Sequence, residues 1–542
     1  LKALADLYAL AGRKNEQLSL YRKIAELKPQ DKAIRDYLAH VEPDKPRADE
    51  SAARDPKEFL AKRNAPANGQ SRRTLSDLQV TTVFQNGLAS RFHQVVFQPL
   101  TDAAAASARQ YAFGYQADSE IVELRSARVF KKDGSVVDAS DTGDAATDNP
   151  EMAMYTSQRA YYVNFPRIDV GDVVEVRYRV EDVAHRNAFA DYFGEVNYFE
   201  SEEPVGRAEY VLVTPKSRKF YFNKPRVPGL KTETTEKGDQ RVYRFVAENL
   251  PAQNNEPLQP PGSELFGYVH VSTYASWDAM GKWYWGLVRD QFVADDEVRR
   301  RVASITKGLT TPDEKVRAIY DYVVQNTRYV ALEFGIHGFK PYRCAQIFAR
   351  GFGDCKDKAT LIVSMLREAG IPATIVIVRT QMRGDFGTEP ASLSPFDHAI
   401  AYVPSLDLYL DGTAEDTGSR ELPAMDRGAL ALQINEGTPK LVRLPDSAAS
   451  TNTTVRRIVA DLSGARNDAG KSSVPVEFTA DVAGVHAPAW RRRYRNVSSQ
   501  RDRIKEDLGS DLPGFEPKAV KANDLTKIEE NVHVEAQGTL SS

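Results

Sequence analysis

The stretch GFGDCKDKATLIVSML, residues 351 to 366, places a single cysteine directly after two glycines and before a long apolar run. We expect a helix to begin at Cys355, because Asp354 is a good N-cap and Gly370 ends the periodic pattern. In the first turn of a helix, unpaired N–H groups and the helix dipole stabilise a thiolate, which is the reactive form of cysteine. Cys355 is therefore a candidate nucleophile, whereas Cys344, the other cysteine, has no such setting.

A nucleophilic cysteine needs a general base, and a histidine downstream of Cys355 is the first candidate. Three histidines follow it, namely His398, His486 and His533. His398 lies in the strand-like run FDHAIAYV, and a second such run, LYLDGT, comes after the turn PSLD. The two runs predict a β-hairpin that carries His398 on its first strand.

The hairpin determines the partner of this histidine. With a loop over residues 403 to 406, we expect three opposed pairs: His398 with Asp411, Ile400 with Tyr409, and Tyr402 with Asp407. Directly opposed residues have Cβ atoms about 5 Å apart, so the Asp411 carboxylate would bond one imidazole nitrogen and leave the other for Cys355. Asp397 is the competing orienter, but it would point to the opposite face of the strand.

Each of these features also has a purely structural explanation. A buried, unreactive cysteine at a helix start is common, and a histidine in a strand more often has a structural role than a catalytic one. The combination of a helix-start cysteine, a downstream histidine and a hairpin-matched aspartate favours the catalytic interpretation. We therefore predict a triad of Cys355, His398 and Asp411.

The composition argues against several classes of protein. Hydrophobic residues make up 42% and charged residues 27% of the 542 residues, which is typical of a globular chain of several domains. The formal net charge of -3 gives no overall field that would attract nucleic acid. Two cysteines without a CxxC pair support neither a disulfide framework nor a cysteine-rich zinc site, and no oxygen-rich calcium loop is visible. We therefore predict no cofactor and no metal.

Two observations concern membranes and export. No apolar run approaches the roughly 18 residues of a membrane span, so we expect no integral membrane segment. The chain opens at Leu1 without a methionine, so we expect a fragment or a processed form. Its localisation is therefore open, and a bacterial periplasmic or extracellular location would fit a signal peptide that this sequence does not contain.

Residues 1 to 41 have apolar residues at helical spacing, and their order resembles one tetratricopeptide repeat. The residues that carry this resemblance are Leu4, Ala5, Tyr8, Gly12, Tyr21, Ile24, Leu27 and Pro29. Gln17 stands where a small residue is usual, and an unrelated helical hairpin explains the same spacing. A repeat would offer a surface for a protein partner. Residues 42 to 75, rich in proline and charge, are expected to be a linker.

The pattern changes to short β-branched and aromatic runs between residues 76 and 258, separated by turn signals. Regular strands without intervening helices predict an antiparallel β-sandwich. Helical patterns return between residues 270 and 430, and strands predominate again between residues 450 and 542. The basic cluster RRRYR, residues 491 to 495, is expected on a solvent-exposed face rather than in contact with nucleic acid or lipid.

The motifs around the predicted triad resemble those of the transglutaminase-like superfamily. The segments that carry the resemblance are YDYVVQNTRYV, GDCKDKATLIVSMLREAGIPATIVIV, FDHAIAYV and YLDGT. The β-rich segments NGLASRFHQVVFQPL, VFKKDGSVVDAS and NFPRIDVGDVVEVRYRV look like DUF3857, a domain of unknown function that accompanies such cores in bacteria. The resemblance implies a papain-like core in which Cys355, His398 and Asp411 are nucleophile, base and orienter.

The predicted fold class is therefore multidomain α+β. A short N-terminal helical repeat precedes a β-sandwich-like domain, and a papain-like, transglutaminase-like α+β core and a C-terminal β-rich domain follow.

Two functions fit this organisation. One is an acyl-transfer enzyme that forms a thioester on Cys355 with a protein or peptide substrate; water would make it a protease or amidase, and an amine would make it a cross-linker. The alternative is a non-catalytic binding or assembly scaffold with a degenerate core.

The state of the thiol separates the two functions. A solvent-reachable sulfur in contact with His398 favours the enzyme, and a buried sulfur with a displaced histidine favours the scaffold. Tyr329 and Glu333 are candidates to line a substrate pocket on position alone.

Overall fold

The computed structural model describes residues 1–27, 32–41, 48–61, 69–147, 154–183, 189, 192–254, 256–435, 437–463 and 473–541. These residues form two compact units. The first unit is Leu1–Met280 together with Leu332–Phe339 and Phe386–Pro395, and the second is Gly281–Ala331, Lys340–Asp385 and Phe396–Ser542. The protein is multidomain α+β: a large β-rich region precedes a helical core, and a β domain follows the core.

Three helices begin the chain, as the apolar spacing predicts: α1 (Lys2–Leu10), α2 (Lys14–Leu27) and α3 (Lys32–Val41). Gly12, in the left-handed region with φ of 69°, allows the turn between the first two. Residues 28 to 31, which include Pro29, lie outside the described part of the chain. The tetratricopeptide interpretation stays a prediction.

The expected linker is partly folded. Residues 42–47 and 62–68 lie outside the described part, but η1 (Ala48–Ala52) and α4 (Lys57–Leu60) lie between them, and β1 begins at Arg72. Asp49 and Glu50 each bond the Arg179 guanidinium at 2.8 Å, and Phe59 is buried in an apolar cluster. The predicted linker over residues 42 to 75 is therefore too long, because some of its charged and apolar residues contact the β domain.

An eight-stranded sheet forms the centre of the β-rich region. Its strands in spatial order are β13 (Lys231–Lys237), β14 (Gln240–Leu250), β11 (Val205–Pro215), β1 (Arg72–Val83), β2 (Ala89–Pro99), β9 (Val173–Asp182), β4 (Glu120–Phe130) and β5 (Val136–Asp138). The neighbours β1 and β11 run parallel, whereas the other pairs are antiparallel. The expectation of a purely antiparallel domain was therefore wrong. A parallel pair needs a long crossover, and the intervening strands supply it.

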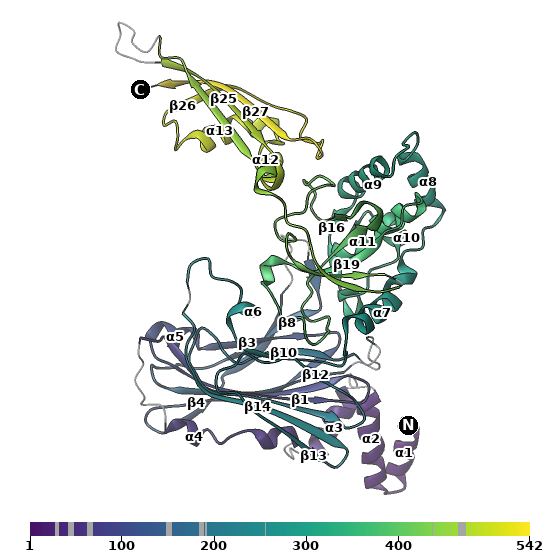
Figure 1. Cartoon of the computed structure of the whole chain (residues 1–542). Coiled ribbons are helices and arrows are strands. Elements are labelled where there is room, and N and C mark those ends of the chain that lie inside the picture. Colours follow the sequence, from purple (N-terminus) through teal and green to yellow (C-terminus); the bar gives the residue numbers. More distant parts are fainter. Residues whose placement is uncertain are drawn as a thin grey trace. The chain divides into compact units, whose positions relative to one another are not determined.

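Two three-stranded sheets pack on the large sheet (Figure 1). One contains β10 (Gly194–Tyr198), β15 (Tyr268–Ser272) and β12 (Tyr221–Phe222), and the other contains β3 (Gln110–Gln116), β8 (Gln158–Asn164) and β6 (Asp141–Ala146). Val269 of β15 packs with Tyr210 of β11, and Val163 of β8 packs with Val176 of β9. The β-rich region thus extends to residue 272, beyond the predicted boundary at 258.

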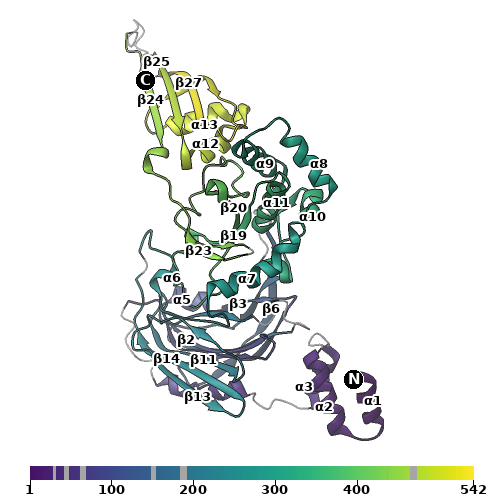
Figure 2. The same ribbon diagram turned by 45° about the vertical axis from the view of Figure 1, so that its right-hand side comes forward.

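The core in the second unit contains a five-stranded sheet in the order β21 (Leu408–Leu410), β20 (His398–Val403), β19 (Thr374–Arg379), β22 (Leu430–Ile434) and β23 (Lys440–Arg443). Four helices gather on one side of it (Figures 1 and 2): α8 (Asp296–Ile305), α9 (Pro312–Asn326), α10 (Cys344–Arg350) and α11 (Cys355–Glu368). Helix α7 (Trp277–Val288) precedes them. The sheet of the core ends at Arg443 rather than near the predicted residue 430, since β22 pairs with the central strand β19.

The C-terminal domain is a four-stranded antiparallel sheet in the order β24 (Thr454–Ala460), β25 (Ser473–Val482), β27 (Val532–Ser541) and β26 (Phe515–Ala522), with helices α12 (Ala487–Tyr494) and α13 (Gln500–Leu508). The cluster RRRYR lies at the end of α12. Arg491 is buried and donates to the Asp416 carbonyl at 2.6 Å, whereas the side chains of Arg492 and Arg495 are more than half exposed. The expectation of a solvated cluster was wrong for Arg491, because it satisfies backbone carbonyls.

Among the residues that the structure describes, no helix is both long enough and apolar enough to cross a membrane.

The Arg179 cluster predicts a strong effect on stability. Its side chain is 1% exposed and contacts Asp49, Glu50 and Glu123 at 2.7 to 2.8 Å. Arg179→Ala should lower the free energy of unfolding of the β-rich region by about 3–5 kcal/mol, because it leaves the buried Asp49 carboxylate without its arginine partner. Glu50 and Glu123 keep their ion pairs with Arg125. Calorimetric unfolding measures the effect. The matched control is Arg167→Ala, whose side chain is 80% exposed in an ion pair with Asp169 and should cost under about 1 kcal/mol. Equal shifts in the two variants would contradict the prediction.

Candidate active site

Helix α11 starts at Cys355, as the sequence predicts. The Asp354 carboxylate accepts a hydrogen bond from the Asp357 N–H at 3.2 Å and is the N-cap. Cys355 is half-buried. Cys344 also lies at a helix start, but it is fully buried, and burial raises the pKa of its thiol to about 11. Both cysteines therefore lie at helix starts, and it is burial that distinguishes Cys355 from Cys344.

Three charged residues follow Cys355 inside the core, and each has a specific partner. Lys356 forms an ion pair with Asp354 at 2.5 Å. Asp357 accepts from the Tyr342 N–H at 2.8 Å and from the Arg350 guanidinium. The Lys358 Nζ donates to the Thr327 carbonyl at 2.6 Å. These bonds fix the loop before α11 and the neighbouring segments around the cysteine.

Gly353 also brings the loop close to this helix. A Cβ at this position would lie 2.5 Å from the Asp357 Cβ, which is closer than side chains can approach. The Gly353 carbonyl accepts from Val330, and Gly353 pairs with Tyr329 where β16 (Arg328–Tyr329) and β18 (Phe352–Gly353) run parallel. The backbone at residues 351 to 354 can therefore pass directly over the start of α11.

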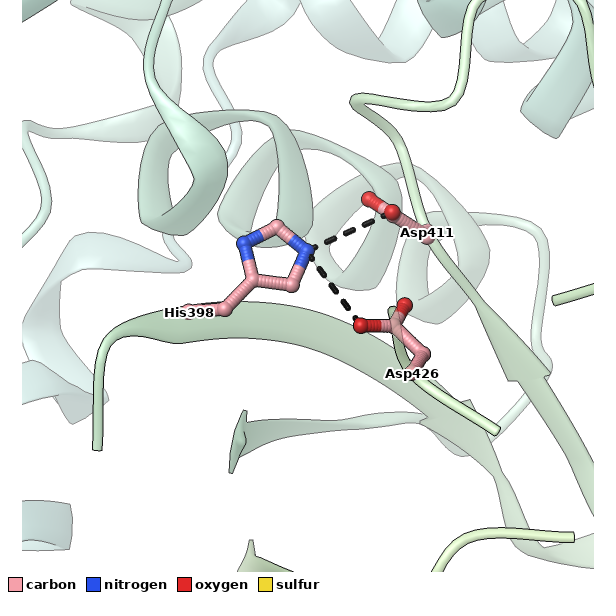
Figure 3. A group of neighbouring side chains, drawn as sticks. All are labelled: His398, Asp411 and Asp426. Atoms are coloured by element: carbon pink, nitrogen blue, oxygen red, sulfur yellow. Dashed lines mark ion pairs between the residues drawn. The ribbon is translucent and has the colours of Figure 1, made fainter. Parts of the chain in front are cut away.

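His398 is the first residue of β20 and pairs with Val378 of the central strand. Its Nε2 lies 3.3 Å from Asp411 Oδ2 and 4.0 Å from Asp426 Oδ1. Figure 3 shows both carboxyl groups on the side of this nitrogen, with the other ring nitrogen turned away from them. The Cys355 thiol is one of the groups that raise the pKa of this ring. The imidazole is thus influenced by a thiol as well as by the carboxylate beside it.

The Asp411 carboxylate is held by groups around it. Its Oδ1 accepts from the Thr413 N–H at 2.8 Å and from the Thr413 hydroxyl at 2.7 Å, which leaves Oδ2 for His398. The Tyr320 hydroxyl of α9 donates to the Asp411 carbonyl at 3.1 Å. Gly412 permits close packing here, since a Cβ would lie 2.9 Å from Ile362 of α11. The aspartate is therefore fixed against the helix that carries the cysteine.

The charges of this group act on one another. Burial opposes protonation of His398, but the neighbouring Asp411 carboxylate and the Cys355 thiol raise the pKa of His398 well above its ordinary value of 6.5. Burial likewise opposes ionisation of Asp411, but His398 and Thr413 lower the pKa of Asp411 overall. The arrangement therefore stabilises an imidazolium next to a carboxylate.

Two family models match the chain. The model described as "Domain of Unknown Function with solved-structure structure (DUF3857)" matches residues 85–254, and the transglutaminase-like superfamily model matches residues 299–403. The chain carries a DUF3857 domain and a transglutaminase-like core. The second match contains Cys355 and His398 but ends before Asp411 and Asp426. No match is found among curated proteins.

One solved structure shows a similar fold over most of this chain. A crystal structure described as a "putative protease" from Parabacteroides distasonis ATCC 8503 is 14% identical, with a TM-score of 0.57 over 87% of this chain and 93% of that chain. A "putative cysteine protease" from Cytophaga hutchinsonii is 15% identical over 41% of this chain and 78% of that chain, with a TM-score of 0.19. An M1 zinc metallopeptidase from Deinococcus radiodurans is 10% identical over 38% and 43%, with a TM-score of 0.21. Only the first resemblance is close enough to inform the fold.

The structure brings the three predicted residues of the transglutaminase-like core together, but through a different hairpin register. The observed pairs are Ala401 with Leu410, Tyr402 with Tyr409, and Val403 with Leu408. The predicted register was wrong by two residues, because Pro404–Leu406 forms a 3-10 turn and Asp407 adopts the left-handed conformation. Asp397 is not the orienter, since its carboxylate accepts from the Thr380 N–H and hydroxyl at 2.8 and 2.7 Å.

Asp426 was not predicted. It lies in the turn before β22, and its side chain is fully buried. Together, His398, Asp411 and Asp426 place three possible ligand atoms within 4.8 Å of one another, a spacing that would admit a metal ion. A tetrahedral zinc site needs a fourth ligand, and the described residues of this group provide three. The prediction of a metal-free site therefore stays a prediction.

A cavity of about 410 Å³ lies beside the Asp411 loop in the second unit. Tyr329, Thr413, Leu422 and Arg427 are among the residues that line it. Tyr329 thus lines a cavity, and its role in a substrate pocket stays a prediction. Glu333 lies on β17 (Ala331–Glu333) and belongs to the first unit, so its proposed role stays a prediction.

The close approach at Gly353 predicts that Gly353→Ala will impair the site. The added Cβ must displace the start of α11, so we expect a loss of Cys355 alkylation rate of roughly tenfold or more. The rate of iodoacetamide labelling measures this. Gly286→Ala is the control, because nothing lies within 4 Å of its added Cβ in helix α7. An unchanged rate in Gly353→Ala would contradict the prediction.

Removal of the Asp411 carboxylate should lower the pKa of His398 toward 6.5, because burial then meets less opposing charge. Because the pKa of His398 is raised on folding, its protonation stabilises the folded state. This contribution to the free energy of unfolding is fully present below pH 6.5 and is lost as the pH rises through the folded-state pKa of His398. Asp411→Ala should remove this pH dependence. A histidine ¹³Cε1 NMR titration of Asp411→Ala checks the shift. His533, which bonds Asp481 at 2.7 Å, should titrate unchanged and is the internal control. An unaltered His398 titration would contradict the assignment.

Proposed function

We propose that the transglutaminase-like core is a cysteine acyl-transfer enzyme that acts on amide or peptide carbonyls. The observation that carries the proposal is the pairing of His398 Nε2 with Asp411 at 3.3 Å, in a core where the Cys355 thiol also raises the pKa of His398. Cys355 is half-buried rather than fully buried, which supports the enzyme over the scaffold. The superfamily match over residues 299–403 supports the same chemistry.

In the first half of the reaction, the thiol proton of Cys355 passes to His398 and the sulfur attacks the carbonyl carbon. A tetrahedral intermediate forms, and its collapse breaks the carbon–nitrogen bond. His398 gives the proton to the leaving amine, so a thioester and a free amine result. Asp411 stabilises the imidazolium and keeps the ring in place throughout.

In the second half, His398 removes a proton from the acyl acceptor, which attacks the thioester. The tetrahedral intermediate collapses with cleavage of the carbon–sulfur bond, and His398 returns the proton to the sulfur, so the Cys355 thiol is regenerated. Water yields a carboxylic acid, whereas an amine yields a new amide. The oxyanion can bind at the start of α11, where the first N–H groups of a helix have no intrahelical acceptor. The Asp354 cap uses the N–H of Asp357, so the N–H of Cys355 is the nearest remaining donor.

Alkylation of Cys355 tests the proposal directly. In a Cys344→Ala background, iodoacetamide should label Cys355 rapidly at pH values well below those at which ordinary thiols ionise. His398→Ala should slow labelling at neutral pH by roughly tenfold or more, because the thiolate loses its imidazolium partner. Cys355→Ala should form no thioester while its unfolding stays unchanged.

Two results would exclude the enzyme. Turnover of an amide substrate by Cys355→Ala would show that the thiol is not the nucleophile. Slow, ordinary labelling that is equal with and without His398 would instead favour the scaffold, and the search would turn to binding partners.

A further inference from the structure

Asp426 is a buried acid without a conventional partner. Its side chain is fully buried, and neither carboxyl oxygen accepts an N–H or hydroxyl hydrogen bond from the residues that the structure describes. The turn that carries it is nevertheless well anchored: the Asp426 N–H donates to the Pro423 carbonyl at 3.0 Å, and its carbonyl accepts from Ala429 at 3.1 Å. The side chain is therefore held at this position by the backbone.

Asp426 faces the same nitrogen of His398 as Asp411 does. Figure 3 shows the two carboxyl groups side by side, at 4.0 and 3.3 Å from Nε2. Asp411 Oδ2, like both Asp426 oxygens, lacks a well-formed hydrogen bond to an N–H or hydroxyl group of the described residues. An ionised carboxylate only accepts hydrogen bonds, so two neighbouring buried carboxylates are unfavourable unless they share a proton.

The distances indicate which carboxyl group holds that proton. Asp411 is nearer to the imidazole and has two bonds from Thr413, all of which favour its charged form. Asp426 has neither bond. Burial and the charge of Asp411 raise the pKa of Asp426 to about 8, although His398 opposes the shift. The charge of Asp397, whose carboxylate is bonded to Thr380, acts in the same direction.

We propose that Asp426 is a positioning residue that donates a hydrogen bond from its protonated carboxyl group to Asp411 Oδ2 and so holds Asp411 against His398. The proposal rests on the proposed function, because it assigns a role within the same site. Asp411 is then held at both oxygens, by Thr413 at Oδ1 and by Asp426 at Oδ2. Ionisation of Asp426 at alkaline pH removes this donor and places a second negative charge beside Asp411.

A metal ion between the same three atoms is the competing explanation. It would need a fourth ligand, while His398, Asp411 and Asp426 are respectively 8%, 0% and 0% exposed in their side chains. This burial leaves little access for a completing water molecule, whereas a proton needs no further ligand. The geometry thus favours a shared proton.

Two substitutions that keep the γ-branched shape of the side chain test the proposal in the full chain. Asp426→Asn keeps a donor to Asp411 but cannot ionise, and Asp426→Leu removes the donor. At pH 7 the Asn variant should keep the wild-type rate of Cys355 alkylation and the wild-type His398 ¹³Cε1 titration. It should also lose the change in labelling that the wild type shows as pH rises through about 8. The Leu variant should label roughly tenfold more slowly or worse at every pH.

Three outcomes would overturn the proposal. Equal rates for the Asn and Leu variants, with unchanged thermal unfolding, would mean that Asp426 only fills space. An alkaline transition that persists in Asp426→Asn would belong to another group. Stoichiometric zinc in the purified wild type, lost in Asp426→Leu and needed for labelling, would establish the metal site instead.

The NMR titration separates this proposal from the proposed function. If Cys355 labelling in the wild type does not depend on His398, the acyl-transfer function fails. The His398 titration can still differ between Asp426→Asn and Asp426→Leu, because it reports the position of Asp411 without any reaction at the thiol. An identical titration in both variants contradicts the positioning role alone.

Discussion

The central constraint on the core is the burial of helix α11 from Lys356 to Leu366. Its apolar residues need no explanation, but three of its first four positions carry charge, and a buried charge is unfavourable unless it is paired. Lys356, Asp357 and Lys358 can therefore be accommodated only if partners surround the helix start. The residues that satisfy them come from the preceding loop, from α10 and from the end of α9. Folding of this helix consequently assembles the neighbourhood of Cys355.

The same constraint connects the helix to the hairpin. Gly412 packs its backbone against Lys358 and Ile362, and Tyr320 of α9 bonds the Asp411 carbonyl. Asp411 is thus positioned by the elements that bury α11, independently of any ligand. A rigid, buried base–acid pair beside a half-buried thiol is the arrangement expected of a preorganised nucleophile, because little reorganisation is needed when charge moves.

Sequence reasoning reached the site through an incorrect hairpin. A slip of two residues leaves every side chain on its original face, because strand side chains alternate with a period of two. His398 and Asp411 therefore share a face in both the predicted and the observed register, whereas a one-residue error would have separated them. The helix start was predictable because Asp354 caps locally. The parallel pairing of β1 with β11 was not, since strand order depends on packing between segments more than 100 residues apart.

Asp426 is a site residue that local sequence patterns do not identify. It lies in an irregular turn, and neither periodicity nor a cap or a motif marks it; its role arises only from its distance to His398 and Asp411. An acid placed there must be neutral to coexist with ionised Asp411 in a dry site, because two adjacent buried charges of one sign cannot both be compensated by a single imidazolium. A neutral acid can donate a hydrogen bond, which an ionised one cannot. Asp426, which as a second buried acid looks incompatible with the site, is thus able to hold Asp411 at Oδ2. This holds as long as water stays out of the site and the pH stays below the pKa of Asp426.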